Sequence, residues 1–374
     1  MNKVLLGDVA VEHKETCKGS KDGYPIVGLE HLIPEEITLT AWDEGSENTF
    51  SKMFRKGNVL FGRRRAYLKK AAVAPFDGIC SGDITVIEAK PDRILPELLP
   101  FIIQNDDLFD FAVGKSAGSL SPRVKWEHLK NYEFELPDME KQKELAELLW
   151  AMDNTKKSYQ KLIVTTDELV KSQFMEQFGS YLGDETRCAT VEQVCTVFAD
   201  GDWIESKDQA DDGIRLIQTG NVGNGVYLDK GERARYIDEE TFVRLNCTEV
   251  LPNDILISRL PDPVGRACII PDGLGKSITA VDCSIVRLKS HVLPEFFVAY
   301  TMTTLYAAQI GSSVTGSTRK RISRKNLGQV VIPTPDIDQQ EQFAAFVRQS
   351  DKSKLLISRL EEFTLMDYRG HGKM

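Results

Sequence analysis

One long segment without proline or glycine places the strongest constraint on the fold. Residues 138–178 contain neither residue type, and Pro137 and Gly179 stand directly outside the segment. Its apolar residues recur every three or four positions, with charges of both signs between them. This spacing predicts an amphipathic helix, and Asp138 is suited to cap its first amides. Such a helix spans about 60 Å at roughly 1.5 Å per residue, so we expect it to connect two domains.

A second segment, residues 336–374, repeats this apolar spacing near the end of the chain. Asp336 followed by Gln339 favours a helix start there, and the pattern is lost after Phe363, which predicts a shorter helix than the first. Each helix has one apolar stripe that needs a partner, so we expect the two to pair antiparallel. The residues predicted to make this contact are Leu145, Leu149, Met152, Tyr159, Ile163, Phe343, Val347, Ile357 and Leu360.

The sequences on either side of the first helix share short similarities in the same order. Residues 213–217 match 23–27, 253–257 match 58–62, and 293–297 match 95–99, so the offset grows from 190 (213 − 23) to 198 (293 − 95). A duplicated domain with loop insertions behaves in this way. We therefore predict an α+β fold with a pseudo-twofold internal repeat. Two mixed α/β domains, 1–137 and 179–335, are separated by antiparallel-paired long helices, 138–178 and 336–374.

Within the first copy, short apolar runs bounded by turn residues predict strands at 24–29, 58–61 and 84–87. A helix is predicted from residue 96 to residue 111. The seven cysteines form no CxxC pair, and no run of eighteen apolar residues occurs. The N-terminus is too acidic for a signal peptide. We expect a cytoplasmic protein with no membrane partner, no disulfide framework, no metal site and no cofactor.

Positive charge is concentrated in acid-free windows, although the formal net charge is −9. These windows are residues 48–76, 111–126 and 296–335, and two of them contain a Gly-Ser turn followed by arginines. Such a turn offers amides, a hydroxyl and guanidinium groups, which bind phosphates and guanine edges. The DNA-binding candidates are Arg63, Arg64, Arg65, Lys69, Lys70, Lys115, Ser119, Arg123, Arg259, Ser317, Arg319, Lys320, Arg321, Arg324 and Lys325. The alternative is a solvated charged surface, but its repetition in both copies favours anion binding.

The catalytic motifs that the sequence approaches are incomplete, so we expect no catalysis by this chain. The pattern Asp83…Glu88-Ala89-Lys90 has the form of a metal-dependent nuclease site, which stays open as an alternative function. In the second copy the matching residues are Asp282 and Arg287, and a duplicated metal site would not survive the change to arginine. A protein scaffold without DNA binding is a further alternative.

Taken together, the repeat and its motifs resemble the specificity subunit of type I restriction–modification systems. The motifs lie at 214–222, 253–256 and 332–342 in the second copy, at 24–30, 57–60 and 136–143 in the first, and at 171–178 in the central helix. The resemblance implies two target recognition domains, each reading half of a split double-stranded DNA sequence. It also implies helices that set the spacer and dock two DNA-adenine methyltransferase subunits, with restriction–translocase subunits completing the assembly. A related modification system outside type I is the remaining alternative.

Overall fold

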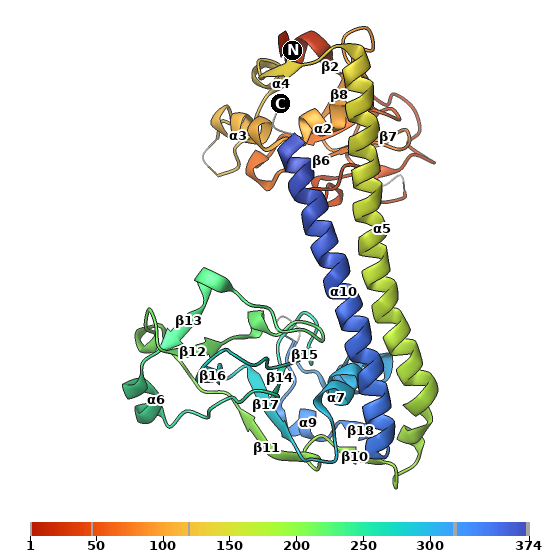
Figure 1. The fold of residues 1–374 in the computed structure, drawn as a ribbon. Coiled ribbons are helices and arrows are strands. Elements are labelled where there is room, and N and C mark those ends of the chain that lie inside the picture. Colours follow the sequence, from red (N-terminus) through yellow and green to blue (C-terminus); the bar gives the residue numbers. More distant parts are fainter. Residues whose placement is uncertain (1, 46–47, 119, 317–319, 372–374) are drawn as a thin grey trace. The chain divides into compact units, whose positions relative to one another are not determined.

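The computed structural model describes residues 2–45, 48–118, 120–316 and 320–371, with side chains up to residue 360 (Figure 1). The chain divides into two compact units. Unit 1 is Met1–Gln160 together with Ser358–Met374, and unit 2 is Lys161–Ile357. Each long helix therefore contributes residues to both units. None of the helices in the described ranges is long and apolar enough to span a membrane.

Unit 1 combines small sheets with short helices. Its strands are β1 (Asn2–Leu5), β2 (Ala10–Glu12), β3 (Ile26–Val27), β4 (Lys52–Phe54), β5 (Val59–Gly62), β6 (Ala71–Val73), β7 (Gly78–Cys80), β8 (Ile84–Ala89) and β9 (Glu133–Leu136). Its helices are α1 (Leu6–Val9), α2 (Leu99–Ile103), α3 (Asp106–Gly114), α4 (Trp126–Leu129) and the first part of α5 (Met139–Phe178). The strand orders are β2-β8-β5-β6, β3-β7-β4 and β1-β9.

Unit 2 is built in the same way. Its strands are β10 (Cys188–Thr190), β11 (Cys195–Asp200), β12 (Ile214–Ile217), β13 (Arg235–Ile237), β14 (Ile255–Ser258), β15 (Ala267–Ile269), β16 (Ser277–Thr279), β17 (Cys283–Leu288) and β18 (Val331–Pro333). Its helices are α6 (Glu239–Leu245), α7 (Pro294–Thr301), α8 (Thr304–Ser313), α9 (Arg324–Gly328) and the first part of α10 (Ile337–His371). The strand orders are β11-β17-β14-β15, β13-β12-β16 and β10-β18.

The strand orders confirm the predicted α+β class. The antiparallel sheet β2-β8-β5-β6 corresponds strand by strand to β11-β17-β14-β15, and the parallel pair β3–β7 corresponds to β12–β16. The smaller sheets differ in their third strand, because β4 pairs with β7 in unit 1 whereas β13 pairs with β12 in unit 2. The copies therefore share a scaffold and differ in which edge of the smaller sheet carries the third strand.

Backbone hydrogen bonds shift one predicted correspondence by a residue. The N–H of Gly57 donates to Ala74 and that of Asn253 donates to Ile270, and both residues have a left-handed φ, of 88° and 67°. Gly57 and Asn253 are thus equivalent, and Asn58 corresponds to Asp254 rather than to Asn253. The matching asparagines were misleading because asparagine tolerates the left-handed region where glycine is otherwise preferred.

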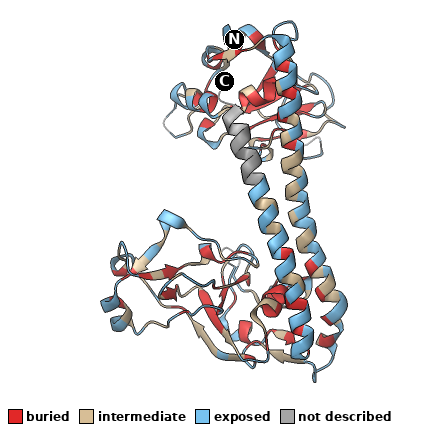
Figure 2. Ribbon diagram, viewed as in Figure 1, coloured by how far each residue is buried: buried red, intermediate tan, exposed pale blue. Residues whose placement is uncertain are grey.

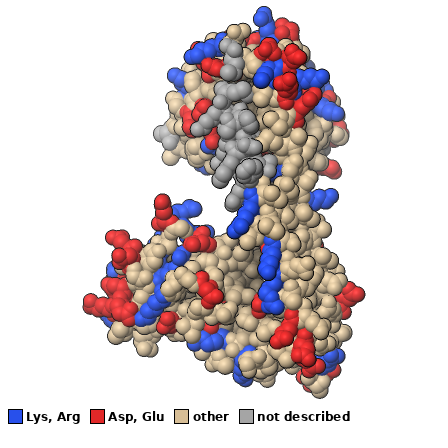
Figure 3. Space-filling view, in the orientation of Figure 1, with Lys and Arg blue, Asp and Glu red and all other residues tan. Residues whose placement is uncertain are grey.

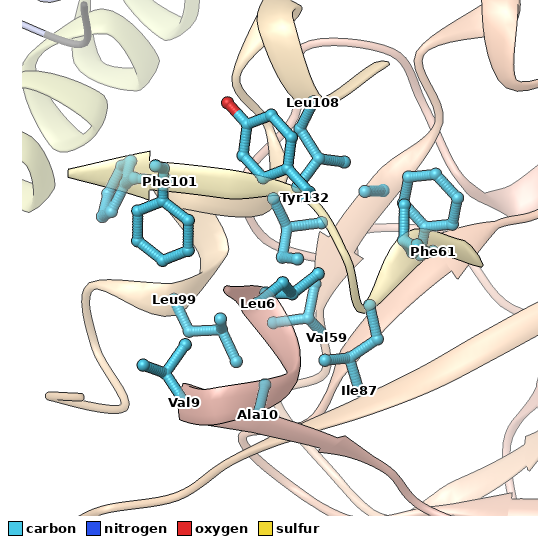
Figure 4. Close-up of a cluster of buried hydrophobic side chains, with 14 of the residues drawn as sticks. Leu6, Val9, Ala10, Val59, Phe61, Ile87, Leu99, Phe101, Leu108 and Tyr132 are labelled. Carbon is cyan, nitrogen blue, oxygen red and sulfur yellow. The ribbon is translucent and has the colours of Figure 1, made fainter. Parts of the chain in front are cut away.

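Alternate side chains of the central strand β5 enter two separate cores. Val59 and Phe61 pack with α2 and α3, as Figure 4 shows for the labelled core residues, while Leu60 packs with Val27 and Phe54. In unit 2, the side chains of β14 alternate between two cores in the same way. A strand covered on both faces reads as a continuous apolar run. All residues of β5 and β14 are buried, and Figure 2 shows buried residues (red) within both units.

A buried glutamine attaches each long helix to the domain before it. The Gln142 side chain accepts from the Leu95 N–H at 2.8 Å and donates to the Pro137 carbonyl at 2.9 Å. Gln340 accepts from the Leu293 N–H at 2.9 Å and donates to the carbonyls of His291 and Pro335. Asp138 caps α5 by accepting from the Lys141 N–H, as predicted. The first turn of each helix is thereby fixed by side-chain hydrogen bonds.

Inside unit 2, α5 and α10 contact each other and run antiparallel. Phe343 of α10 packs against Phe174 and Phe178 of α5, with ring centroids 5.4 and 5.6 Å apart. Further along, Lys354 of α10 pairs with Asp167 of α5 at 2.7 Å. Figure 1 shows α10 (blue) beside this part of α5. The predicted helix pairing is confirmed, although the predicted contact set lacked Phe174 and Phe178.

The other residues predicted to pair the helices have different environments. Leu145 and Leu149 pack into the core of unit 1, and Val347 packs into that of unit 2. Met152, Tyr159, Ile163 and Ile357 are half-buried, and Leu360 is exposed. α10 also continues to His371, beyond the point where the apolar pattern is lost. The single helix predicted for 96–111 is instead two helices, because Asn105 caps α3 through its side chain.

Candidate nucleic-acid interface

In unit 1, the end of β5 and the start of β8 bring two basic windows together. The Arg63 N–H donates to the Asp83 carbonyl at 3.0 Å, and the Val124 N–H donates to the Arg63 carbonyl at 3.0 Å. Ala117 and Arg123 form a reciprocal pair of backbone hydrogen bonds. The window around residue 63 and the turn before residue 124 are thus side by side, although they are far apart in sequence.

The Asp83 carboxylate is the centre of the side-chain cluster in unit 1. It accepts from Nε and Nη2 of Arg123 at 2.7 and 3.2 Å, and it lies 3.5 Å from Nη1 of Arg64. Arg64 also donates from Nε to the Ser121 hydroxyl. The hydrogen bond from Arg123 holds the pKa of Asp83 below its usual range and raises that of Arg123. One ionised carboxylate therefore orients two guanidinium groups.

Unit 2 repeats this backbone arrangement. The Arg259 N–H donates to the Asp282 carbonyl at 2.9 Å, and the Ile322 N–H donates to the Arg259 carbonyl at 3.2 Å. Thr315 and Arg321 form the same reciprocal pair as Ala117 and Arg123. In the side chains, Nη2 of Arg321 lies 3.3 Å from the Asp282 carboxylate. We call Asp83, Arg63, Arg64 and Arg123 the Arg–Asp cluster of unit 1. The Arg–Asp cluster of unit 2 consists of Asp282, Arg259 and Arg321.

A second carboxylate extends the Arg–Asp cluster of unit 2. Asp200 lies 3.4 Å from both Nη2 of Arg259 and Nε of Arg324. Arg324 also donates to the Phe198 carbonyl at 2.8 Å. Arg259 is only 4% exposed, and burial lowers its pKa. Arg259 is thus the buried member of the cluster, and its contact with DNA stays a prediction.

The equivalent arginines Arg63 and Arg259 share an unusual feature. In each, Nε is buried and has no hydrogen-bond partner among the described residues. An unpaired buried donor is costly, and it recurs at the same backbone position in both units. This recurrence indicates that Arg63 and Arg259 occupy equivalent positions in the two copies of the domain.

The remaining candidates lie around the clusters. Arg65 and Lys69 flank a short turn, and both have a left-handed φ, of 54° and 51°. Lys69 pairs with Asp106, and Lys70 donates to the Leu29 carbonyl. Lys115, Lys320 and Lys325 are exposed. Ser119, Ser317 and Arg319 lie outside the described residues.

Sequence reasoning missed the acidic members of these clusters. Asp83, Asp200 and Asp282 lie outside the acid-free windows, and the fold brings them into contact with arginines up to 124 residues away (324 − 200). Asp83 was considered only as part of a nuclease motif. The available signal was that Asp83 and Asp282 precede matching strands in the repeat. Figure 3 shows acidic and basic side chains interspersed over the face in view.

The nuclease motif does not assemble. Asp83 stands just before β8 and Glu88 near its end, so the two are about 16 Å apart, five residues at roughly 3.3 Å each. Glu88 lies 2.7 Å from Nδ1 of His13, and Lys90 donates to the Gly7 carbonyl. Across the described ranges, no group of three or more His, Cys, Asp or Glu could hold a metal ion. The separation of the two carboxylates excludes this motif as a shared cation site.

Known proteins provide sequence similarity over most of the chain. Residues 3–164 and 186–362 match the family described as the type I restriction modification DNA specificity domain. The chain is 20% identical over 366 residues to the putative type I restriction enzyme MjaX specificity subunit of Methanocaldococcus jannaschii, covering 90% of this chain and 83% of that protein. It is 25% identical over 183 residues to the EcoDI specificity subunit of Escherichia coli, covering 48% and 37%.

Solved structures show the same fold. The S subunit of the type I restriction–modification system of M. genitalium has a TM-score of 0.54 at 11% identity, covering 100% of this chain and 95% of that one. A chain from a structure describing assembly and conformational transition of a type I system has a TM-score of 0.53 at 20% identity, covering 98% and 97%. Together with the family match over two segments, these findings establish the family to which the chain belongs. It belongs to the type I restriction–modification specificity subunits, the non-catalytic DNA-binding components of restriction systems.

Proposed function

We propose that this chain directs a type I restriction–modification enzyme to a bipartite DNA target, with one half read by each unit. The observation that carries the proposal is the duplicated Arg–Asp cluster, which occupies the same backbone position in unit 1 and unit 2. Arginines read guanine edges through bidentate hydrogen bonds and also bind phosphates. Residues 1–137 and 179–335 are the proposed recognition domains, with Arg64 and Arg321 as base readers and Lys69 as a phosphate contact.

The long helices are proposed to dock two DNA-adenine methyltransferase subunits, with restriction–translocase subunits completing the enzyme. Within unit 2, both helices expose apolar side chains along their length. These are Leu162, Val164 and Leu169 on α5, and Leu355 and Leu356 on α10. Apolar side chains on a helix surface suit burial against partner helices. The proposal accords with a similar chain having been solved in a study of type I complex assembly.

The helices are also proposed to set the spacer between the half-sites. α5 is continuous across the boundary between Gln160 and Lys161, so an insertion within it lengthens a helix that joins the two units. Inserting four residues after Lys157 adds about 6 Å at roughly 1.5 Å per residue and nearly preserves the apolar phase. B-DNA advances about 3.4 Å per base pair on a strand, so the spacer should grow by one or two base pairs.

The test is to sequence DNA methylation in a host that carries the gene, its four-residue insertion, or no gene. We expect a split motif that depends on the gene, with unchanged half-sites and a longer spacer for the insertion. A matched control inserts four residues after Gly183, which is exposed outside both long helices. The control should leave the spacer unchanged. A continuous motif, or an unchanged spacer at full methylation in the α5 insertion, would contradict the proposal.

A further inference from the structure

Each Arg–Asp cluster contains an acid where a surface that binds phosphate would be expected to exclude one. The acid-free windows of the sequence supply only bases. The fold nevertheless places Asp83 and Asp282, which directly precede β8 and β17, beside these bases. A carboxylate at this position repels phosphate oxygens, which weakens binding to any DNA. Its presence in both copies calls for an advantage that offsets this cost.

Orientation of an arginine is that advantage. A guanidinium has five N–H donors in a fixed plane. Asp83 accepts from Nε and Nη2 of Arg123, which fixes the plane of that guanidinium while the side chain stays 42% exposed. Arg321 pairs with Asp282 and is 45% exposed. A reading arginine that is already oriented loses less conformational entropy on binding a base edge.

An ordinary surface ion pair is the alternative explanation. Such pairs contribute little to stability, and their positions need not repeat between copies of a domain. Here the same backbone hydrogen bonds place the aspartate, the arginine with a buried Nε (Arg63 or Arg259) and the outer arginine (Arg123 or Arg321) in both units. The side chains around them differ, since Ser121 joins the cluster in unit 1 and Asp200 joins it in unit 2. The shared part of the two clusters is the aspartate with its outer arginine.

We propose that Asp83 and Asp282 are positioning residues for base recognition, which orient Arg123 and Arg321 and thereby raise specificity while lowering affinity for DNA in general. The inference rests on the proposed function, in which each unit reads half of the target. It assigns Asp83 and Arg123 to one half-site, alongside the proposed base reader Arg64, and Asp282 and Arg321 to the other. The aspartates act through the arginines.

The test uses the full chain with its methyltransferase subunits and two duplexes, one carrying the motif read from the methylome and one of random sequence. For Asp83→Asn and Asp282→Asn we expect tighter binding to random DNA, by about threefold, because one repulsive charge is lost. The ratio of cognate to random affinity should fall about tenfold, equivalent to one oriented contact. Methylome sequencing should show relaxed bases in one half-site for Asp83→Asn and in the other for Asp282→Asn.

Asp106→Asn is the matched control, because Asp106 pairs with Lys69 outside the Arg–Asp cluster. It removes the same charge and should change cognate and random binding alike. Arg123→Lys provides a second variant, since it keeps the charge and loses the planar fork. It should lower the affinity ratio without tightening random binding.

Two outcomes separate the inference from the function on which it rests. If the wild-type enzyme discriminates its motif but Asp83→Asn, Asp282→Asn and Arg123→Lys all keep the wild-type ratio, the positioning role is overturned and the proposed function stands. If the wild-type enzyme does not prefer its motif over random DNA, both are overturned.

Discussion

Unit 1 and unit 2 share a backbone framework but hold their long helices with different side chains. In unit 1, the start of α5 buries Ala146 and Leu149 in the core and adds an aromatic contact between Trp150 and Phe101, with ring centroids 5.1 Å apart. In unit 2, the end of α5 inserts Phe174 and Phe178 into an aromatic cluster with Phe296 and Phe343. Duplication has kept the strand order of the four-stranded sheets and the backbone hydrogen bonds of the Arg–Asp clusters, whereas packing residues have diverged.

The largest expected effect tests the aromatic attachment. Phe174→Ala should destabilise the protein by about 3–5 kcal/mol, because it leaves a cavity among rings that cannot easily collapse. Leu149→Ala, in the part of α5 that packs into unit 1, should cost about 2–3 kcal/mol. Denaturant unfolding measures the total, and hydrogen exchange over 139–160 and 165–178 localises it. A larger cost for Leu149→Ala would show that the aromatic cluster is not the stronger attachment.

An intermediate effect is expected at the buried glutamines. Gln340→Leu should cost about 2–3 kcal/mol, because three backbone groups lose a partner, whereas Gln142→Leu orphans two and should cost about 1–2 kcal/mol. Gln342→Leu, an exposed site on the same helix, is the control and should stay within about 0.5 kcal/mol of wild type. The measurement is again denaturant unfolding. Equal costs at all three positions would show that the hydrogen bonds of the buried glutamines do not stabilise the attachment of the helices.

The features that could be predicted are those with a local signal. The 3.6-residue period persists over forty positions of α5, so its existence and direction of pairing followed from the sequence. The break at Asn105 was missed because a capping side chain interrupts a continuous apolar pattern. The Arg–Asp clusters could not be predicted, since Arg123 and Asp83 are forty residues apart and meet only through the sheet. The basic half of each cluster was visible as a charge window, and the acidic half was not.

The smallest effect concerns acid pH and Asp83. The hydrogen bond from Arg123 lowers the folded-state pKa of Asp83, against an unfolded value of about 3.9. The interaction therefore adds stability above that unfolded value, and the contribution is lost as pH falls through the folded pKa. The difference in unfolding free energy between wild type and Asp83→Asn should be under about 1 kcal/mol at pH 6 and should vanish in strong acid. A difference that grows on acidification would contradict this assignment.

The buried amides of Gln142 and Gln340 have a consequence for how such a protein can change. They set the direction in which each helix leaves its domain through hydrogen bonds to main-chain atoms only. Main-chain atoms are present whatever the neighbouring side chains are. The loops proposed to bind DNA can therefore accumulate substitutions, and the sheets can gain or lose an edge strand, while the helix keeps its alignment. New recognition surfaces can thus evolve without a change in the hydrogen bonds that attach each helix to its domain.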